Sequence, residues 1–485
     1  MAWGTNITCV ARLGQIASDV VAKERERRKD MAVLKQAKDA SRRWVIRQMV
    51  KLLPRLTMDN METMISLGQK LLKNPEYIET AESLKRYIRE GHPAVKVVEK
   101  VLYDLSPEAR FRTIYNLFIR GLLYGTTYRE EIVEDLGFRP PLFFVISPTM
   151  RCNLKCYGCY SGEYEQDYGL STELLDRVFT EAEELGMAFI TVSGGEPFIR
   201  KDLLDLFENH KEMMFQVYTN GTLIDEEMAK RLAKMGNVAP MISVEGFEQI
   251  TDERRGKGHY KKIMKAMDYL RKEGVLFGAS VCQTRKNYLE VSSEEFADLM
   301  AEKGVFLIWH FQYIPIGREP DLSLMLTPEM RDTIRRRLRY IRNNWPFFIC
   351  DFWNDGPYVD GCIAGGREYF HINANGDVEP CVFVHFAVDN IKEKSLKEAL
   401  NSEFFRDIRA HQPWSENPLC PCMIIDNPHC LRDMVKRHRP IPTHVGAEKI
   451  VNELAPYLDE YAQNYHKIAH KAWNEEYAEE YGRYL

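Results

Sequence analysis

The sequence predicts an α/β fold: a partial (β/α)6 barrel of the TIM type, with a helical region before it and a cysteine-rich extension after it. From Leu142 onward, short apolar runs alternate with amphipathic stretches, which is typical of βα units that build a parallel sheet. The preceding residues contain few glycines and many long charged runs, which favour helices. Most of the eleven cysteines fall into two groups, and the second group follows the last predicted strand.

Six apolar runs are predicted as strands, and the amphipathic stretches between them as helices. The strands are expected near residues 142–148, 188–193, 215–219, 239–245, 276–283 and 306–313. The helices are expected near residues 171–186, 201–211, 225–235, 260–273 and 292–303. Connections of this length suit right-handed crossovers. Because parallel strands end at one face of a barrel, residues that follow them should meet at a common site.

Changes in composition divide the chain into four regions joined by a bridge. The bridge is an arginine-rich stretch from Met330 to Asn344 that is predicted as a helix. The regions are a helical part over 1–138, the barrel over 139–330, the cysteine-rich extension over 345–435 and a helical tail over 436–485.

Composition excludes several classes of protein. A chain of 485 residues with 45% hydrophobic content can bury a large core. Its formal charge of -5 gives no strong electrostatic attraction to nucleic acid, so a nucleic-acid substrate is unsupported but not excluded. No stretch reaches the roughly 18 apolar residues of a membrane helix, and the start lacks a secretory pattern. An odd number of cysteines argues against a secreted disulfide scaffold, so we expect a cytoplasmic protein.

Three cysteines lie within eight residues directly after the first predicted strand: Cys152, Cys156 and Cys159. Three thiolates can ligate one iron–sulfur cluster and leave its fourth iron open. An open iron is what S-adenosylmethionine (SAM) needs to chelate the cluster and accept an electron that breaks its carbon–sulfur bond. The spacing therefore indicates radical chemistry. Zinc remains the alternative, although a closed zinc site normally takes four protein ligands.

This part of the chain resembles the radical SAM superfamily. Gly194-Gly195-Glu196-Pro197 follows the second predicted strand, where the family places a glycine-rich turn that contacts the SAM amino group. The resemblance implies that a reduced [4Fe–4S] cluster cleaves bound SAM to methionine and a 5′-deoxyadenosyl radical, which abstracts hydrogen from an unactivated C–H bond. It also implies an oxygen-sensitive enzyme of oxidoreductase or transferase type, with an electron donor such as ferredoxin or flavodoxin.

Polar residues at successive predicted strand ends are candidate SAM contacts. Ser193, Asn220 and Ser243 can reach the ribose and carboxylate of SAM. Each also has a structural alternative, because serine and asparagine commonly cap helices or form turns. Glu245 is expected either to approach SAM or substrate or to form a structural ion pair.

The aromatic contact with adenine departs from the family pattern. The family usually carries an aromatic residue immediately before the third cysteine, whereas this chain has Gly158. Tyr157 and Tyr160 are expected to take over that contact, with simple packing as the alternative. The last barrel strand, near Trp309, resembles the family strand on which adenine packs. His310 in that strand is expected to be a hydrogen-bonded core histidine, with a catalytic role as the alternative.

The second cysteine group surrounds a predicted β-hairpin. Cys362 and Cys381 flank it, and Asn375-Gly376 forms its turn. The segment is similar to the auxiliary-cluster extension called SPASM, or its half-size relative twitch, in which Cys-x9–15-Gly-x4-Cys opens an added [4Fe–4S] site. One auxiliary cluster is expected, with zinc as the alternative. Two further ligands are expected from the group Cys420, Cys422 and Cys430, with Cys350 in reserve.

Two substrate classes follow. Radical SAM proteins with auxiliary clusters often modify peptides or enzyme side chains, so peptide or protein modification is one hypothesis. The other is lipid alkyl-chain modification by C–C coupling. It rests on the basic amphipathic stretch Ser41–Arg55, which suits the inner membrane surface, and on the apolar stretch Thr113–Tyr124. Alternatively, both stretches pack on the barrel. A non-catalytic iron–sulfur scaffold or binding protein is the alternative of another class.

Overall fold

The computed structural model describes residues 75–165 and 169–481, together with a few positions between 47 and 69. Most of the predicted basic stretch Ser41–Arg55 lies outside the described residues. The chain divides into two units, Met1–Thr57 and Met58–Leu485, and every element discussed below belongs to the second unit.

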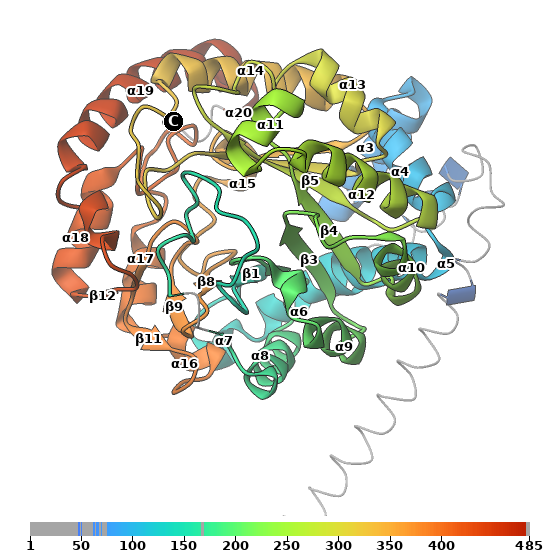
Figure 1. The fold of residues 1–485 in the computed structure, drawn as a ribbon, viewed down its shortest axis with the longest axis horizontal. Helices are drawn as coiled ribbons and strands as arrows, with labels where there is room; N and C mark the ends of the chain where they lie inside the picture. The colour runs from blue at the N-terminus through green and yellow to red at the C-terminus, as the bar shows by residue number, and fades with distance from the viewer. Residues whose placement is uncertain are drawn as a thin grey trace, which may run out of the picture. The chain divides into compact units, whose positions relative to one another are not determined.

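Six parallel strands form the centre of a ten-stranded sheet (Figure 1). They pair in chain order: β1 (Phe143–Ile146), β2 (Phe189–Val192), β3 (Met214–Thr219), β4 (Val238–Ser243), β5 (Gly278–Gln283) and β6 (Leu307–Gln312). Phe143 lies opposite Phe189, and Phe189 lies opposite Met214, so neighbouring strands run in step. Their carboxyl ends therefore meet at one face, and the predicted partial barrel is confirmed.

Helices cover the outer side of these strands at the expected places (Figure 1). They are α8 (Thr172–Glu184), α9 (Asp202–Asn209), α10 (Glu226–Met235), α12 (His259–Glu273) and α13 (Glu294–Glu302). Ser171, Asp225 and Ser293 accept hydrogen bonds from backbone N–H groups in the first turns of α8, α10 and α13. Such caps satisfy donors that a helix start leaves without partners. A further helix, α11 (Glu248–Arg255), follows β4 and was not predicted.

Further strands extend the sheet at both edges. β7 (Phe348–Asp351) pairs in parallel with β6, after the bridging helix α14 (Pro328–Asn344). At the other edge, β8 (His371–Ile372) pairs in parallel with β1, and β9 (Asp377–Glu379) returns antiparallel to β8. This is the hairpin predicted around Asn375-Gly376, and it continues the barrel sheet. β11 (Asp389–Asn390) pairs antiparallel with β9 at the edge of this sheet, whereas β10 (Phe386–Ala387) and β12 (Ile441–Pro442) form a separate two-stranded sheet.

The remaining described elements are helical. Before the barrel they are α3 (Pro75–Glu90), α4 (Pro93–Tyr103), α5 (Pro107–Arg112), η2 (Thr113–Tyr124), α6 (Gly125–Glu131) and α7 (Val133–Leu136). The short helices η3 (Pro197–Ile199) and α15 (Gly356–Val359) follow β2 and β7, and the later ones are α16 (Leu396–Leu400), α17 (Glu403–His411), α18 (Pro428–His438), η4 (Ala447–Ile450), α19 (Ala455–Glu476) and α20 (Ala478–Tyr481). No helix in the described part of the chain is both long and apolar enough to span a bilayer.

The π-helical segment η2 packs against the amino-terminal ends of the barrel strands. Asn116 donates a hydrogen bond to the carbonyl of Lys211, directly before β3, at 2.9 Å. A Cβ on Gly121 would lie 2.8 Å from the Cβ of Ala188, directly before β2. These contacts come from a polar residue and a glycine, whereas 43% of Phe118 and 56% of Tyr124 are exposed. That the apolar face of this stretch packs on the barrel therefore stays a prediction. Since the strands run away from η2, it lies opposite the carboxyl-end face.

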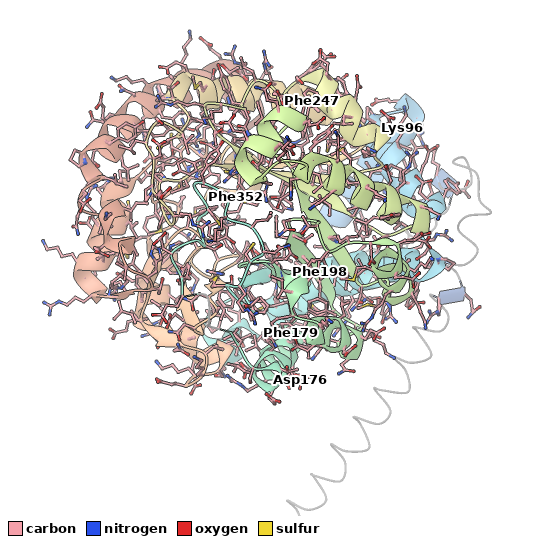
Figure 2. All side chains as sticks on the ribbon, in the orientation of Figure 1. Lys96, Asp176, Phe179, Phe198, Phe247 and Phe352 are labelled. Carbon is pink, nitrogen blue, oxygen red and sulfur yellow. The ribbon has the colours of Figure 1, made fainter. Side chains whose placement is uncertain are left out.

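The core lies between the strands and their covering helices. Phe207 of α9 stacks on Phe215 of β3 with ring centroids 4.2 Å apart, and Phe179 of α8 contacts both. Burying one such side chain stabilises a fold by about 1.5–3 kcal/mol. Figure 2 labels Phe179 among these helices, and it labels Phe352, which follows β7, near the middle of the molecule.

A fully buried ion pair joins α14 to the cysteine-rich extension. The guanidinium of Arg331 binds both carboxylate oxygens of Asp426, and neither side chain is exposed to solvent. The guanidinium also lies 3.7 Å from the ring centroid of Tyr465 on α19. Three elements distant in sequence therefore depend on one buried charge pair, which is stable only while both partners are present.

Candidate functional site

A cavity of about 200 Å³ opens at the carboxyl ends of the barrel strands. Cys152, Cys156 and Cys159 all line it. Among the described residues, no three His, Cys, Asp or Glu side chains converge closely enough to hold a single metal ion. In a [4Fe–4S] cluster each thiolate binds its own iron, so three thiols that line one cavity fit the cluster that the sequence predicts.

The glycine-rich turn lies directly against the cysteine loop. The N–H groups of Gly195 and Glu196 donate to the carbonyls of Thr149 and Arg151, both at 2.9 Å. A Cβ on Gly195 would collide with the Arg151 carbonyl, and Gly194 has a φ of 100°, which side chains rarely adopt. Glycine is therefore required for the turn to support the cysteine loop, in addition to the predicted approach to SAM.

Glu196 supports the end of β3 and does not line the cavity. Its carboxylate accepts hydrogen bonds from Thr219 Oγ1 at 2.8 Å, from the N–H of Asn220 at 2.7 Å and from the N–H of Phe198 at 3.1 Å. Its burial raises the pKa of the carboxyl group. Pro197 is buried in the first turn of η3 and also lies outside the cavity wall.

The polar strand ends do face the cavity. Ser193, Asn220 and Ser243 line it together with Gly194 and Gly195. Tyr160 lines it too, and its hydroxyl lies 2.5 Å from Ser193 Oγ. These residues remain the candidate SAM contacts, now around one cavity.

The aromatic beside the third cysteine is one that the sequence did not indicate. A Cβ on Gly158 would lie 2.7 Å from a ring carbon of Tyr313, which follows β6 and lines the same cavity. The structure does not place Tyr157 in the cavity. Its ring lies 5.9 Å from the Arg254 guanidinium and 5.0 Å from the Lys286 ammonium.

Two arginines of α11 also line the cavity, and sequence analysis missed them. Both pair with Glu245, which is fully buried: Arg254 Nη1 at 2.7 Å and Arg255 Nη2 at 2.5 Å. Burial alone would raise the pKa of Glu245, but the two guanidinium groups outweigh it and hold the pKa below its ordinary value. Of the two roles predicted for Glu245, the structure shows the ion pair. Arg254 also donates to the carbonyls of Tyr157 and Gly158.

Arg255 is a candidate contact for the SAM carboxylate, because its Nη1 makes no hydrogen bond within the described residues. Replacement Arg255→Gln is expected to weaken SAM binding about tenfold or more, since a hydrogen bond to a charged group contributes about 1.5–3 kcal/mol. Equilibrium binding of SAM to the reconstituted protein measures this. Lys261→Gln, which removes the exposed partner of Glu248, is the control. Equal affinities in both variants would contradict the assignment.

A second cavity, of about 130 Å³, is lined by four cysteines. They are Cys350 of β7, Cys362, Cys381 after β9, and Cys422. Burial raises the pKa of the thiols of Cys350 and Cys381 to about 12. A metal must therefore displace a proton to bind them. Four thiolates around one cavity fit a closed [4Fe–4S] site.

The structure does not place Cys420 and Cys430 in this cavity, although sequence analysis proposed them with Cys422. Cys420 is fully buried near the ion pair of Arg331 and Asp426. Cys430 lies on α18, with its Sγ 3.4 Å from Nε2 of His429. The reserve candidate Cys350 occupies the cavity wall instead.

An aromatic wall separates the two cavities. Trp309, Phe352 and Phe383 line both of them. His310 is buried in β6 between Trp309 and Phe311, and its burial lowers its pKa to about 3. It lines neither cavity. Its Nδ1 has no hydrogen-bond partner within the described residues, so the expected hydrogen bond is wrong at that atom.

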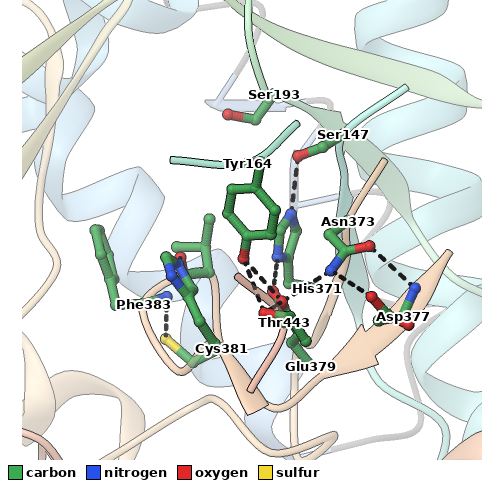
Figure 3. A network of polar contacts seen from close by, with 12 residues as sticks. Ser147, Tyr164, Ser193, His371, Asn373, Asp377, Glu379, Cys381, Phe383 and Thr443 are labelled. Carbon is green, nitrogen blue, oxygen red and sulfur yellow. Dashed lines mark hydrogen bonds and ion pairs between the residues drawn. The ribbon is translucent and has the colours of Figure 1, made fainter. Parts of the chain in front are cut away.

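A buried polar network fixes the hairpin of the extension against the barrel (Figure 3). Nε2 of His371 lies 2.9 Å from Ser147 Oγ at the end of β1, and its Nδ1 lies 2.6 Å from Glu379. Tyr164 donates to the same carboxylate at 2.8 Å, and Thr443 donates at 2.5 Å. Asn373 and Asp377 continue the network through the turn. The network thereby fixes β9, the strand that leads to Cys381, to the end of β1.

Family comparisons agree with this architecture. The family model of the radical SAM superfamily matches residues 146–302, which include the cysteine triad, the glycine-rich turn and both arginines. Residues 146–302 are therefore a radical SAM domain. A second model, of the iron–sulfur cluster-binding domain SPASM, matches residues 362–423. The chain thus carries a radical SAM domain followed by a SPASM domain, and these domains imply a [4Fe–4S] cluster, SAM and auxiliary iron–sulfur clusters as cofactors.

Relatives of known activity are distant. Fe-coproporphyrin III synthase of Methanosarcina barkeri is 32% identical over 224 residues, which are 44% of this chain and 56% of that protein. Mycofactocin maturase MftC of Mycobacterium tuberculosis is 28% identical over 299 residues, or 57% of this chain and 75% of that one. The crystal structure of Streptococcus suis SuiB has a TM-score of 0.49 and 19% identity, and covers 69% of this chain and 80% of SuiB.

Proposed function

We propose that this enzyme uses radical SAM chemistry to modify a peptide or protein substrate. One observation carries the proposal: a single cavity holds the cysteine triad and the polar strand ends, and it shares an aromatic wall with a second cavity of four cysteines. The wall places an apolar substrate position between two candidate cluster sites. A non-catalytic scaffold would not need that arrangement.

Each part of the cavity has a distinct task. Cys152, Cys156 and Cys159 would hold the SAM-binding cluster, which when bound supplies the electron that cleaves SAM to a 5′-deoxyadenosyl radical. The polar strand ends and Arg255 orient SAM through its charged groups. The aromatic side chains exclude water and stray hydrogen donors from the reacting position, which is the usual contribution of protein to radical cofactor chemistry.

The second cavity suits electron transfer better than substrate binding. Cys350, Cys362, Cys381 and Cys422 would give every iron of a [4Fe–4S] cluster a protein ligand. Such a closed site has no open iron for a substrate. We therefore propose that the auxiliary cluster exchanges electrons with the substrate position across the shared aromatic wall.

Replacing one ligand tests this ligand set. Cys350→Ala is expected to lower bound iron by about four per chain, because a [4Fe–4S] cluster that loses one thiolate is less stable. Cys430→Ala is the matched control and is expected to retain full iron, since Cys430 lies outside the cavity. Iron and sulfide analysis after anaerobic reconstitution measures both. Loss of iron in Cys430→Ala alone would assign the fourth ligand to α18.

The substrate class is argued from relatives and from the cavity. A relative named as a maturase supports modification of a peptide or protein. Tetrapyrrole modification is the second candidate, because a relative is named Fe-coproporphyrin III synthase and the shared wall is aromatic. The lipid hypothesis keeps its basic stretch, most of which lies outside the described residues. Its other stretch, η2, packs at the opposite end of the barrel from the cavity.

The test is anaerobic reconstitution, reduction with SAM, and mass detection of 5′-deoxyadenosine. A peptide extract, iron coproporphyrin III and a lipid extract are added in parallel. Cleavage stimulated by the peptide extract supports the proposal, and stimulation only by the porphyrin or the lipid replaces its substrate class. Fully loaded protein that never cleaves SAM would restore the scaffold alternative.

Partners and location follow as further proposals. The SAM-binding cluster needs a low-potential donor, for which we propose ferredoxin or flavodoxin. We propose a cytoplasmic enzyme, in keeping with the unpaired cysteines and the need for reduced clusters. Peripheral contact with the inner membrane surface belongs to the lipid hypothesis and is tested with it.

A further inference from the structure

Tyr369 connects the two cavities. It lines the first cavity, while its hydroxyl oxygen lies 2.7 Å from Sγ of Cys381, which lines the second. The side chain is 1% exposed. Its ring stacks on Phe143 at 5.4 Å and meets Phe352 edge-on at 5.8 Å. Packing on both sides therefore fixes the direction of the hydroxyl group.

The hydroxyl can act only as donor once Cys381 binds iron. A metal-bound thiolate carries no proton, so its Sγ accepts the hydrogen bond and the Tyr369 O–H donates it. Hydrogen bonds to charged acceptors are stronger than neutral ones. The other donor to this sulfur is the backbone N–H of Phe383 at 3.5 Å, which is a longer contact (Figure 3). Cys422 accepts a backbone N–H, from Ile424 at 3.3 Å.

We propose that Tyr369 is a positioning residue that raises the reduction potential of the auxiliary cluster through its hydrogen bond to Cys381. The inference rests on the proposed function, in which that cluster occupies the second cavity. One electron added to the oxidised cluster increases the negative charge on its sulfurs, and a donated hydrogen bond stabilises that charge. Tyr369 also lines the first cavity, so the sulfur that it stabilises belongs to the cysteine that this side chain links to the substrate cavity.

The alternative is that the hydroxyl only completes the hydrogen bonding of a buried side chain. The two roles differ in what a Tyr369→Phe replacement changes. Under either role, the replacement removes the hydrogen bond to Cys381 and keeps the ring that stacks on Phe143. Only the tuning role predicts a change in the reduction potential of the cluster without loss of iron.

The experiment uses the full chain with Cys152, Cys156 and Cys159 replaced by alanine, so that only the auxiliary cluster titrates. A redox titration followed by electron paramagnetic resonance measures its midpoint potential. Tyr369→Phe is expected to shift the midpoint to a more negative value while bound iron stays at about four per chain. Tyr313→Phe is the matched control. Tyr313 also lines the first cavity, but its hydroxyl accepts a hydrogen bond from the N–H of Asp321 at 3.0 Å and makes none to cysteine within the described residues, so the midpoint should not move.

The outcomes distinguish absence of the auxiliary cluster from absence of a tuning role for Tyr369. No iron in the triad-free parent would refute the auxiliary cluster itself, and with it the proposed function of the second cavity. A loaded Tyr369→Phe variant with an unchanged midpoint would refute only the tuning role. Loss of iron from Tyr369→Phe, with Tyr313→Phe still loaded, would also overturn tuning, in favour of structural support for Cys381.

Discussion

Replacing Cys152, Cys156 and Cys159 together with alanine is expected to abolish SAM cleavage. The three thiols are the cluster ligands offered by the first cavity, and without the cluster no electron reaches SAM. Bound iron should fall by about four per chain, while the auxiliary cluster remains. Mass detection of 5′-deoxyadenosine after anaerobic reduction, together with iron analysis, measures both effects.

Cys430→Ala serves as the control for this replacement. It removes a thiol of the extension that lines neither cavity, so SAM cleavage and iron content should match the parent enzyme. Retained cleavage in the triple replacement would overturn the assignment of the first cavity. A triple variant that still binds all its iron but does not cleave SAM would show that the triad is needed for cleavage but does not ligate the cluster.

The second large effect concerns stability. Asp426→Asn is expected to lower the free energy of unfolding by about 3–5 kcal/mol, because it leaves the Arg331 guanidinium buried without a counter-charge. Guanidinium chloride unfolding followed by tryptophan fluorescence measures the change. The double replacement Arg331→Met with Asp426→Leu should recover much of the loss, since an apolar pair removes both buried charges.

The matched control for stability is Asp459→Asn. Asp459 pairs with Arg432 at 2.8 Å, but 41% and 29% of these side chains are exposed. Surface pairs of this kind contribute about 0–1 kcal/mol. If both replacements destabilised the protein equally, burial of the Arg331 pair would not be the cause.

Local patterns predicted the barrel because each strand is specified by its own apolar run and each covering helix by its own amphipathic period. β7 was missed because its four residues directly follow a long helix and are too few to show alternation. The triad was predictable for a related reason: its three ligands lie within one turn-forming segment, so their spacing alone carries the signal.

The remaining site residues depend on distance in sequence. Tyr313 fills the space beside Gly158, and no local pattern joins two residues so far apart. Arg254 and Arg255 end a short, strongly polar helix that reads as a solvated surface, and only the buried Glu245 gives them their place in the cavity. Sequence analysis ranked Cys350 below Cys420 and Cys430 because motif spacing favours cysteines that are close in sequence. The fold instead brings Cys350 to the cavity from β7.

The position of the second cavity links metal loading to the shape of the whole barrel. Cys350 belongs to β7 at one edge of the parallel sheet, and Cys381 follows the hairpin at the other edge. A cluster bound by both cysteines would link the two edges of the open sheet. At such a site the free energy of cluster binding adds to the free energy of folding. The apoenzyme should therefore be less stable where the two sheet edges line the second cavity. The supply of iron would then determine what fraction of the protein molecules has the two edges of the sheet joined before substrate binds.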